Sequence, residues 1–389
     1  MQVVFKKSGG AGRAASNLSN LLKNESETTS IDSITIKRRR IKLIIIYLLA
    51  IFDNYIIKKR NAKSFFSIYR SNFNSINDVE DISQEKTLHL QWIPGMISLK
   101  KLDTISRNNK IIITLHDMWF FTGGCHFNSG CNQYKSGCLD CPQIKKNHRN
   151  KVHQQFQLKQ KIFSQAADVK IIAPSKWIKN LAEESMILTD MNIKLIDNAP
   201  PVESINYKSR QDLRNKFGIS STDFVVGFIS VNIRDKRKNI DELILALEKF
   251  CSIHKKEVNT VLLTKGKGKI KNNKLFKIVN LGYSDVNEEL TDFYGVIDLL
   301  AVTSSEDNAP LVVYEALIND VPIAYKRTGG LVDQLEGNNL GKPYSTTEEL
   351  AEILVDISFK HGTNFAPKNN YDYRQLVEEI RLKHLEVYE

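Results

Sequence analysis

Two carboxylates stand where a parallel sheet would place its ligands. Asp307 lies in the polar loop after the apolar run 297–302, which has the length and composition of a buried strand. Glu315 lies in the stretch that follows, where Asp307 or Asn308 can cap a helix and Pro310 suits its first turn. Ligands of open α/β sheets bind at such loops, and one carboxylate accepts two hydrogen bonds. Glu315 therefore suits a vicinal diol such as a ribose, while the loop amides suit phosphate or sugar hydroxyls; a capped helix with a solvated glutamate is the alternative.

A glycine-rich turn and a histidine form a second candidate set in the first half. The turn 8–13 follows the strand-like segment 1–5 and precedes a helix expected from 14 to 22. Backbone amides of such a turn can approach a phosphate closely, with a helix amino end behind them. His116 and Asp117 end another strand-like run. A single histidine at a strand end is more often structural, so neither feature identifies a site alone.

Four of the five cysteines are close together, at Cys125, Cys131, Cys138 and Cys141. Four thiolates with one Cys-x2-Cys pair can hold a tetrahedral zinc ion, so a structural zinc is one interpretation. The first spacing is wider than in common zinc ribbons, and two local disulfides or simple packing thiols are the alternatives. We assign these cysteines no catalytic role.

The composition is that of a globular protein of two domains. The chain has 389 residues, 42% of them hydrophobic and 25% charged. Its net charge of +11 suits an anionic membrane, a nucleotide sugar or a nucleic acid. The basic residues are dispersed and no nucleic-acid-binding module is recognisable, so no nucleic-acid partner is expected.

A basic and apolar segment, residues 37–60, suits a membrane surface. Its apolar part is shorter than the roughly 18 residues that a membrane span needs, but basic flanks with aromatic residues suit a helix in the headgroup region. A buried core helix is the alternative. The first residues lack the regions of a signal peptide. We therefore expect a cytoplasmic protein, peripheral on the inner face of the plasma membrane, with an anionic membrane surface as a partner.

Alternating strands and helices in both halves predict an α/β fold with two Rossmann-like, doubly wound parallel-sheet domains. The loop 198–201 contains two prolines and is the best domain boundary. We expect a first domain over 1–200, a second over 201–370 and a terminal helix over 371–389.

The runs 114–125 and 303–317 resemble signatures of retaining glycosyltransferases of the GT4 family (glycosyl transferases group 1), in its bacterial surface-polysaccharide branch. The resemblance implies the GT-B fold, in which two domains face a cleft. The first domain would bind the acceptor and the second the nucleotide-sugar donor, and the terminal helix would pack back on the first domain.

The implied function is transfer of a sugar, with retention of configuration, in capsule, O-antigen or exopolysaccharide synthesis. The donor would be a UDP- or GDP-sugar, and the acceptor a saccharide or lipid-linked saccharide. A GT-B protein without turnover, acting as a partner in a polysaccharide assembly complex, is the alternative function.

The resemblance also implies roles for residues of this sequence. The implied catalytic residues are His116, Asp117 and Lys238. The implied donor-binding residues are Gly10, Ala11, Gly12, Arg13, Arg234, Arg237, Lys238, Gly282, Asp307, Asn308, Ala309, Pro310, Leu311 and Glu315. Lys238 and an arginine would neutralise the donor diphosphate, and the chain has no Asp-x-Asp metal anchor. We therefore expect catalysis to require no metal or other cofactor.

Overall fold

The computed structural model of the chain describes residues 2–4, 9–22, 40–73, 87–201, 208–253, 258–284, 287–336, 341–360 and 373–388. The chain divides into two compact units, each described here by itself. Unit 1 is Met1–Ala199 with Glu378–Glu389, and unit 2 is Pro200–Val377. Part of the segment 37–60, namely residues 37–39, lies outside the described residues, as do residues 371–372 of the expected terminal helix.

Unit 1 contains a sheet of five parallel strands in the order β1-β2-β3-β4-β5. The strands are β1 (Gln2–Val4), β2 (Thr87–Trp92), β3 (Lys110–Thr114), β4 (Asp168–Ala173) and β5 (Ile193–Leu195). The central strand β3 is apolar on both faces, because alternate residues enter different cores. Ile111 and Ile113 join the larger core, while Ile112 packs in a smaller cluster with Val387 of the terminal helix.

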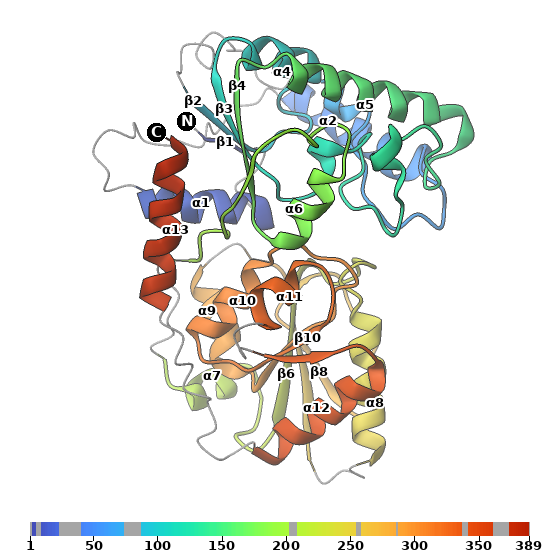
Figure 1. Ribbon diagram of the computed structural model, residues 1–389. Coiled ribbons are helices and arrows are strands. Elements are labelled where there is room, and N and C mark those ends of the chain that lie inside the picture. Colours follow the sequence, from blue (N-terminus) through green and yellow to red (C-terminus); the bar gives the residue numbers. More distant parts are fainter. Residues whose placement is uncertain are drawn as a thin grey trace. The chain divides into compact units, whose positions relative to one another are not determined.

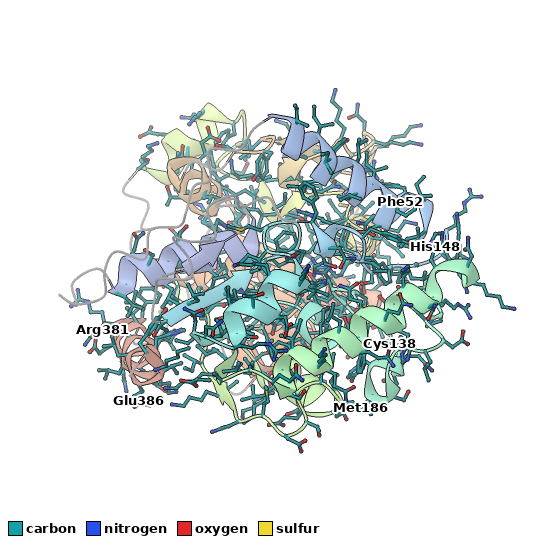
Figure 2. The ribbon with its side chains drawn as sticks, turned by 90° about the horizontal axis from the view of Figure 1, so that it is seen from above. Phe52, Cys138, His148, Met186, Arg381 and Glu386 are labelled. Carbon is teal, nitrogen blue, oxygen red and sulfur yellow. The ribbon has the colours of Figure 1, made fainter. Side chains whose placement is uncertain are left out.

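Among the described residues, six α-helices and a short π-helix belong to this unit wholly or in part. They are α1 (Gly10–Leu22), α2 (Arg40–Ile51), the π-helix η1 (Phe52–Ile56), α4 (Leu99–Ser106), α5 (Arg149–Ser164), α6 (Lys176–Glu183) and α13 (Tyr373–Tyr388). Serines cap two of them: Ser98 accepts a hydrogen bond from the amide of Lys101, and Ser175 from the amide of Ile178. Figure 2 shows Phe52 and His148 together at one side of the unit, with their rings 5.9 Å apart, and α13 at the other side.

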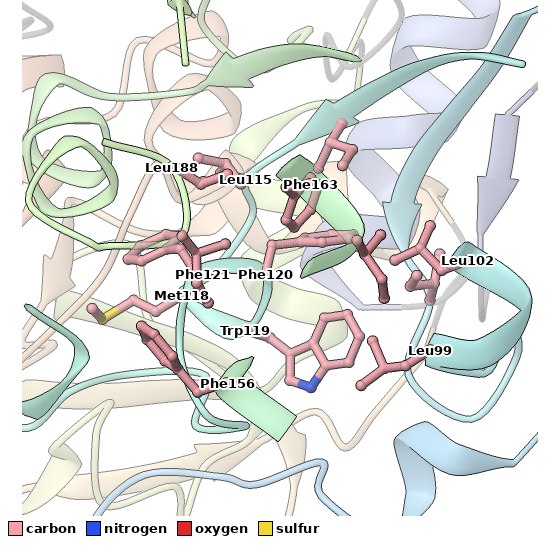
Figure 3. Packing of buried hydrophobic residues seen from close by; sticks show 14 of the residues in the cluster. Leu99, Leu102, Leu115, Met118, Trp119, Phe120, Phe121, Phe156, Phe163 and Leu188 are labelled. Atoms are coloured by element: carbon pink, nitrogen blue, oxygen red, sulfur yellow. The ribbon is translucent and has the colours of Figure 1, made fainter. Parts of the chain in front are cut away.

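The turn after β3 is anchored by three consecutive aromatic residues. Trp119, Phe120 and Phe121 form a short 3-10 helix, and all three side chains are buried. Figure 3 shows them entering the core beside Phe156 and Phe163, which come from α5. This packing fixes the segment that directly follows His116 and Asp117.

Unit 2 contains six parallel strands in the order β11-β10-β9-β6-β7-β8. They are β6 (Phe224–Asn232), β7 (Thr260–Lys267), β8 (Lys277–Asn280), β9 (Leu299–Val302), β10 (Ile323–Lys326) and β11 (Lys342–Tyr344). The order reverses between β6 and β9. From β6 the chain builds the sheet outward through β7 and β8, and from β9 it builds in the other direction.

Helices cover both faces of this second sheet (Figure 1). They are α7 (Arg210–Lys216), α8 (Ile240–Ile253), α9 (Asn287–Val296), α10 (Leu311–Ile318), α11 (Gly330–Leu335) and α12 (Thr347–Lys360). Helices α8 and α12 share a core with Val226 and Leu262, and the other four share a core with Val225 and Leu263. The predicted α/β fold with two parallel sheets is confirmed.

Candidate active site

The loops after β6 and β9 meet at the point where the strand order of unit 2 reverses. Lys238 lies in the first loop and Asp307 in the second, and Lys238 Nζ lies 2.5 Å from Asp307 Oδ2. Ser304 Oγ donates to the same carboxylate oxygen at 2.9 Å. Crevices of this kind, outside the carboxyl ends of strands at a reversal point, are where open α/β sheets bind ligands.

Arg237 adds a second positive charge beside Asp307. Its Nη1 lies 3.4 Å from Asp307 Oδ1 and donates to the carbonyl of Glu306 at 2.8 Å. Burial alone would raise the pKa of Asp307, but Lys238 and Arg237 outweigh it and hold that pKa at about 2. Burial lowers the pKa of Lys238, and Asp307 opposes that shift. The three groups therefore form a charged cluster with an excess of positive charge.

Backbone contacts hold the two loops in register. Thr303 Oγ1 donates to the carbonyls of Lys238 and Asn239, at 2.7 and 3.1 Å. The amide of Gly330 donates to the carbonyl of Asp307 at 2.9 Å. A Cβ on Gly329, which has a φ of +56°, would lie 2.2 Å from that carbonyl oxygen. Only glycine allows this close approach, so the 329–330 turn has a defined role in placing Asp307.

Glu315 lies in α10, buried, and accepts a hydrogen bond from the hydroxyl of Tyr294 in α9 at 2.7 Å. The expected helix cap is wrong. Pro310, rather than Asp307 or Asn308, occupies the N-cap position, and it makes no side-chain cap hydrogen bond. The reason is that Asp307 already binds Lys238 and Ser304, and its Oδ1 accepts from the amide of the adjacent Asn308.

The other predicted donor-binding residues of unit 2 lie in three separate segments of the chain. Arg234 donates from Nε to the carbonyl of Lys269 at 2.9 Å, whereas Arg237 is the arginine beside Asp307. Gly282 follows β8, and its carbonyl accepts from the amide of Gly266 in β7 at 2.8 Å. Asn308, Ala309, Pro310 and Leu311 form the link from Asp307 into α10, with Asn308 and Ala309 buried.

In unit 1, His116 follows β3 directly. Its Nε2 lies 2.6 Å from Gln91 Oε1, at the carboxyl end of the neighbouring strand β2. Burial lowers the pKa of His116 to about 4, against the opposing effect of Asp117. His116 is therefore a neutral imidazole at physiological pH, able to donate one hydrogen bond and accept another.

Asp117 binds the surrounding protein through both carboxylate oxygens. Oδ1 accepts from the amide of Trp119 at 2.8 Å, while Oδ2 accepts from Trp92 Nε1 and lies 2.7 Å from His126 Nδ1. His126 Nε2 in turn lies 2.9 Å from the hydroxyl of the buried Ser67. Burial would raise the pKa of Asp117, but His126 and the Trp119 amide outweigh it and lower that pKa. Through these contacts Asp117 can orient the side chains of Trp92 and His126.

The glycine-rich turn differs from the prediction. Gly10, Ala11, Gly12 and Arg13 are the first residues of α1, which starts four residues earlier than expected. The amide of Arg13 donates to the carbonyl of Gly9, whose φ is +94°, so the turn is completed one residue before the helix. A Cβ at Gly10 would meet no atom within 4 Å, so the space around residue 10 does not require glycine. Helix-terminal amides replace the expected loop amides.

The cysteine cluster does not supply a metal-ligand set. Cys125, Cys131, Cys138 and Cys141 are free thiols, and within the described ranges no three His, Cys, Asp or Glu side chains are placed to hold a metal ion. Burial raises the pKa of Cys138 to about 12, so without a bound metal its side chain is a neutral thiol. Cys138 Sγ instead accepts a hydrogen bond from the amide of Gly123. The arrangement matches the alternative of packing thiols.

Part of the chain matches a known protein family. Residues 209–358, nearly all of unit 2, match the family described as glycosyl transferases group 1. The predicted GT-B fold is confirmed, and the predicted resemblance to GT4 is supported over residues 209–358.

The individual proteins that this chain resembles are distant in sequence. WcaC of Escherichia coli (strain K12), named as a colanic acid biosynthesis glycosyl transferase, is 24% identical over 292 residues. That match covers 70% of this chain and 65% of WcaC, just under two thirds of its length.

Two solved structures share the fold over almost the whole chain. A glycosyltransferase from Rickettsia africae ESF-5 superposes with a TM-score of 0.61 at 16% identity, covering 100% of this chain and 96% of that one. HepE of Anabaena, solved with UDP-glucose, gives a TM-score of 0.59 at 14% identity, covering 99% and 98%.

Proposed function

We propose that this chain transfers a sugar from a nucleotide-sugar donor to a saccharide or lipid-linked saccharide, with retention of configuration, during synthesis of a bacterial surface polysaccharide. The observation that supports this most directly is the cluster at the reversal point of unit 2. Lys238 and Arg237 lie beside Asp307, and Glu315 lies in α10, the helix that follows Asp307. Of the two solved structures, one is named as a glycosyltransferase and the other contains UDP-glucose.

The proposed chemistry follows from charge. Departure of a nucleoside diphosphate builds negative charge, which fixed cations stabilise without any reorganisation. Lys238 and Arg237 supply those cations, and Asp307 holds them in place while contacting the donor sugar. Glu315 accepts the two ribose hydroxyls, with its carboxylate oriented by Tyr294. His116 of unit 1 forms a hydrogen bond with the acceptor or the donor sugar. No metal is required, because these cations do what a divalent ion does elsewhere.

The test is a transfer assay on the purified full chain. Panels of UDP- and GDP-sugars are combined with polyprenyl-diphosphate-linked saccharides, and the product is analysed by NMR. We expect release of a nucleoside diphosphate and a new linkage with the anomeric configuration of the donor, equally with and without EDTA. A donor that binds without any transfer or hydrolysis would favour the non-catalytic partner instead. Inversion of configuration, or loss of activity in EDTA restored by magnesium, would contradict the mechanism.

We further propose that α2 and η1 rest on an anionic membrane, where a lipid-linked acceptor would lie. In the part of the chain that the structure describes, no helix is long and apolar enough to cross a membrane. Ile41, Ile44, Tyr47 and Leu48 recur at helical spacing on α2 and are all exposed. Asp53, the one acid in the sequence from 40 to 56, is buried and accepts backbone hydrogen bonds from Ile68 to Arg70. The exposed side is thus apolar, and the flanking residues are basic.

A further inference from the structure

A row of polar side chains leads from His116 to the end of the terminal helix, all within unit 1. His116 Nε2 lies 2.6 Å from Gln91 Oε1, and Gln91 Nε2 lies 2.9 Å from His89 Nε2. His89 Nδ1 lies 2.6 Å from the hydroxyl of Tyr388. Gln91 and His89 are buried, so these hydrogen bonds are sheltered from exchange with water. We call Gln91, His89 and Tyr388 the relay.

The amide of Gln91 sets the direction of the hydrogen bonds. Its Oε1 can only accept, so His116 must carry a proton on Nε2. Its Nε2 can only donate, so His89 must accept on Nε2 and carry its own proton on Nδ1. The hydroxyl of Thr114 lies 2.7 Å from the same nitrogen. One glutamine therefore fixes the tautomers of two histidines.

The surroundings keep both histidines neutral. A buried imidazolium would need a paired anion, and His89 is instead surrounded by Gln91, Thr114, Tyr388 and a third histidine, His384, whose ring lies 6.4 Å away. Burial lowers the pKa of His89 well below its ordinary value, and lowers that of His384 to about 4. A neutral imidazole carries a single N–H, so the proton position is the only remaining variable.

The end of α13 is held firmly enough to fix the last member of the relay. Lys110 Nζ donates to the carbonyl of Tyr388 at 2.9 Å, and Lys170 Nζ donates to the carbonyl of Val387 at 3.0 Å. Cations at a helix carboxyl end also interact favourably with its dipole. Val387 packs with Ile112 of β3, so the helix end is attached to the strand that carries His116.

We propose that Gln91, His89 and Tyr388 are positioning residues that fix His116 as the Nε2–H tautomer, so that Nδ1 is its acceptor nitrogen. A group that hydrogen bonds to Nδ1 must then be a donor. A sugar hydroxyl meets this requirement, whereas a deprotonated phosphate oxygen does not. The assignment of His116 to a saccharide hydroxyl rests on the proposed function, while the tautomer itself does not.

The tautomer is measured directly by NMR of the full chain labelled with [15N]histidine, at about pH 7 and without substrate. The His116 and His89 signals are assigned as those lost in His116→Gln and His89→Gln. We expect a protonated Nε2 on His116 and a protonated Nδ1 on His89. The opposite tautomer on His116, or an imidazolium there, would overturn the proposal.

Variants of Gln91 separate positioning from simple packing. In Gln91→Glu the carboxylate still accepts from His116 but cannot donate to His89, so His116 keeps its proton on Nε2 while His89 Nε2 becomes protonated. In Gln91→Leu the acceptor is lost, and a fraction of His116 moves its proton to Nδ1. Unchanged signals in both variants would contradict the relay. Should Gln91→Leu fail to fold, Gln91→Glu still decides the outcome.

Tyr388→Phe tests the far end of the relay. It removes the acceptor of His89 Nδ1 while the Gln91 amide still donates to Nε2, so we expect His89 to keep its proton on Nδ1 with a shifted 15N signal. Tyr373→Phe is the matched control, because Tyr373 lies on the same helix and its hydroxyl binds the carbonyl of Pro201 outside the relay. Its spectrum should match the wild type for both histidines. An identical effect of the two substitutions would count against a specific relay.

Kinetics link the tautomer to turnover. We expect Gln91→Leu to lower kcat by about 10-fold with the donor KM changed by less than about 2-fold, and Gln91→Glu to retain more activity. A wild-type chain with the expected tautomers and no transferase activity would refute the proposed function and leave the relay standing. Normal transferase activity in a wild-type chain whose His116 exchanges between both tautomers would refute the relay and leave the proposed function standing.

Discussion

Lys238 is the residue whose charge the proposed chemistry uses most. Replacing it with alanine removes a cation at the departing diphosphate and leaves Asp307 without its closest partner. We expect Lys238→Ala to lower kcat by about 100-fold or more, the usual cost of losing one transition-state electrostatic contact. Lys236→Ala is the control, since Lys236 lies exposed in the same loop and should retain full activity. Steady-state rates of nucleoside diphosphate release compare the two, and equal rates would remove Lys238 from the site.

Tyr294 offers a finer test at the same scale. Its hydroxyl orients Glu315, so Tyr294→Phe should weaken nucleotide binding by about 10-fold, as loss of a hydrogen bond to a charged group does. Tyr325→Phe is the matched control: the Tyr325 hydroxyl is buried with no hydrogen-bond partner among the described residues. Fluorescence titration with UDP measures both variants. If Tyr294→Phe bound UDP as tightly as the wild type, the role of Glu315 would need revision.

Some of these residues follow from sequence and others do not. Asp307 and Glu315 could be predicted because strand, loop and helix signals fix their places along one element. Tyr294 and Gln91 could not, since each meets its partner through packing between elements far apart in sequence. Spacing also could not choose between Arg234 and Arg237, because the choice depends on which way the loop turns after β6.

At the scale of elements, α2 makes the membrane proposal testable. Ile44 and Tyr47 are 58% and 66% exposed, and charge on this side of the helix should prevent insertion into headgroups. We expect the wild-type chain to sediment with phosphatidylglycerol vesicles at low salt and less with phosphatidylcholine vesicles. Ile44→Glu with Leu48→Glu should lower the bound fraction several-fold.

The control for this experiment is Ile253→Glu, at the end of α8 in unit 2. Ile253 is 66% exposed, so the substitution is matched in chemistry and exposure. It should leave sedimentation unchanged. Equal sedimentation of the α2 variant and the wild type would eliminate the membrane-facing role, while preserved transfer to a short soluble acceptor would show that the variant is folded.

Element boundaries show where sequence signals fail. The α10 cap was mispredicted because Asp307, a good capping residue by type, is recruited by Lys238 and Ser304. Gly10 to Gly12 were expected in a turn because glycine disfavours helices, yet burial of Gly12 and its neighbours against unit 1 overrides that preference. Tertiary contacts decided both cases.

At the scale of the whole molecule, the two units should respond differently to acid. His89, His116 and His384 of unit 1 all have pKa values lowered by burial. In the unfolded chain they titrate near 6.5, so the unfolded state binds protons first as the pH falls. Unit 1 is then fully stable above about pH 6.5 and loses about 1.4 kcal/mol per pH unit, for each histidine that stays neutral, between 6.5 and 4.

Asp307 of unit 2 changes stability in the same direction as these histidines, but at lower pH. Its pKa is lowered to about 2 from an ordinary value of 3.8, so its contribution is present above that value and is lost only in stronger acid. Hydrogen exchange with mass spectrometry at about pH 7.5 and about pH 5, corrected for intrinsic rates, reports each unit separately. We expect lower protection in unit 1 peptides at the lower pH. Equal protection of unit 1 at both values would contradict the neutral buried histidines.

The sequence predicted both sheets and most helices, since parallel strands covered on both faces read as short apolar runs. It could not predict how the cysteines meet. That depends on the turn at Gly123, where Cys138 accepts an amide hydrogen bond, and such a contact leaves no trace in spacing.

We propose that the loops after β6 and β9 bind the diphosphate and ribose of a nucleotide sugar. Calorimetric titration of UDP and GDP into the purified chain tests it most directly, with Glu315→Gln compared with Glu306→Gln in the adjacent loop. We expect saturable binding of one nucleotide per chain, weakened by Glu315→Gln and unaffected by Glu306→Gln. Absence of binding to the wild type, or equal binding by both variants, would contradict it.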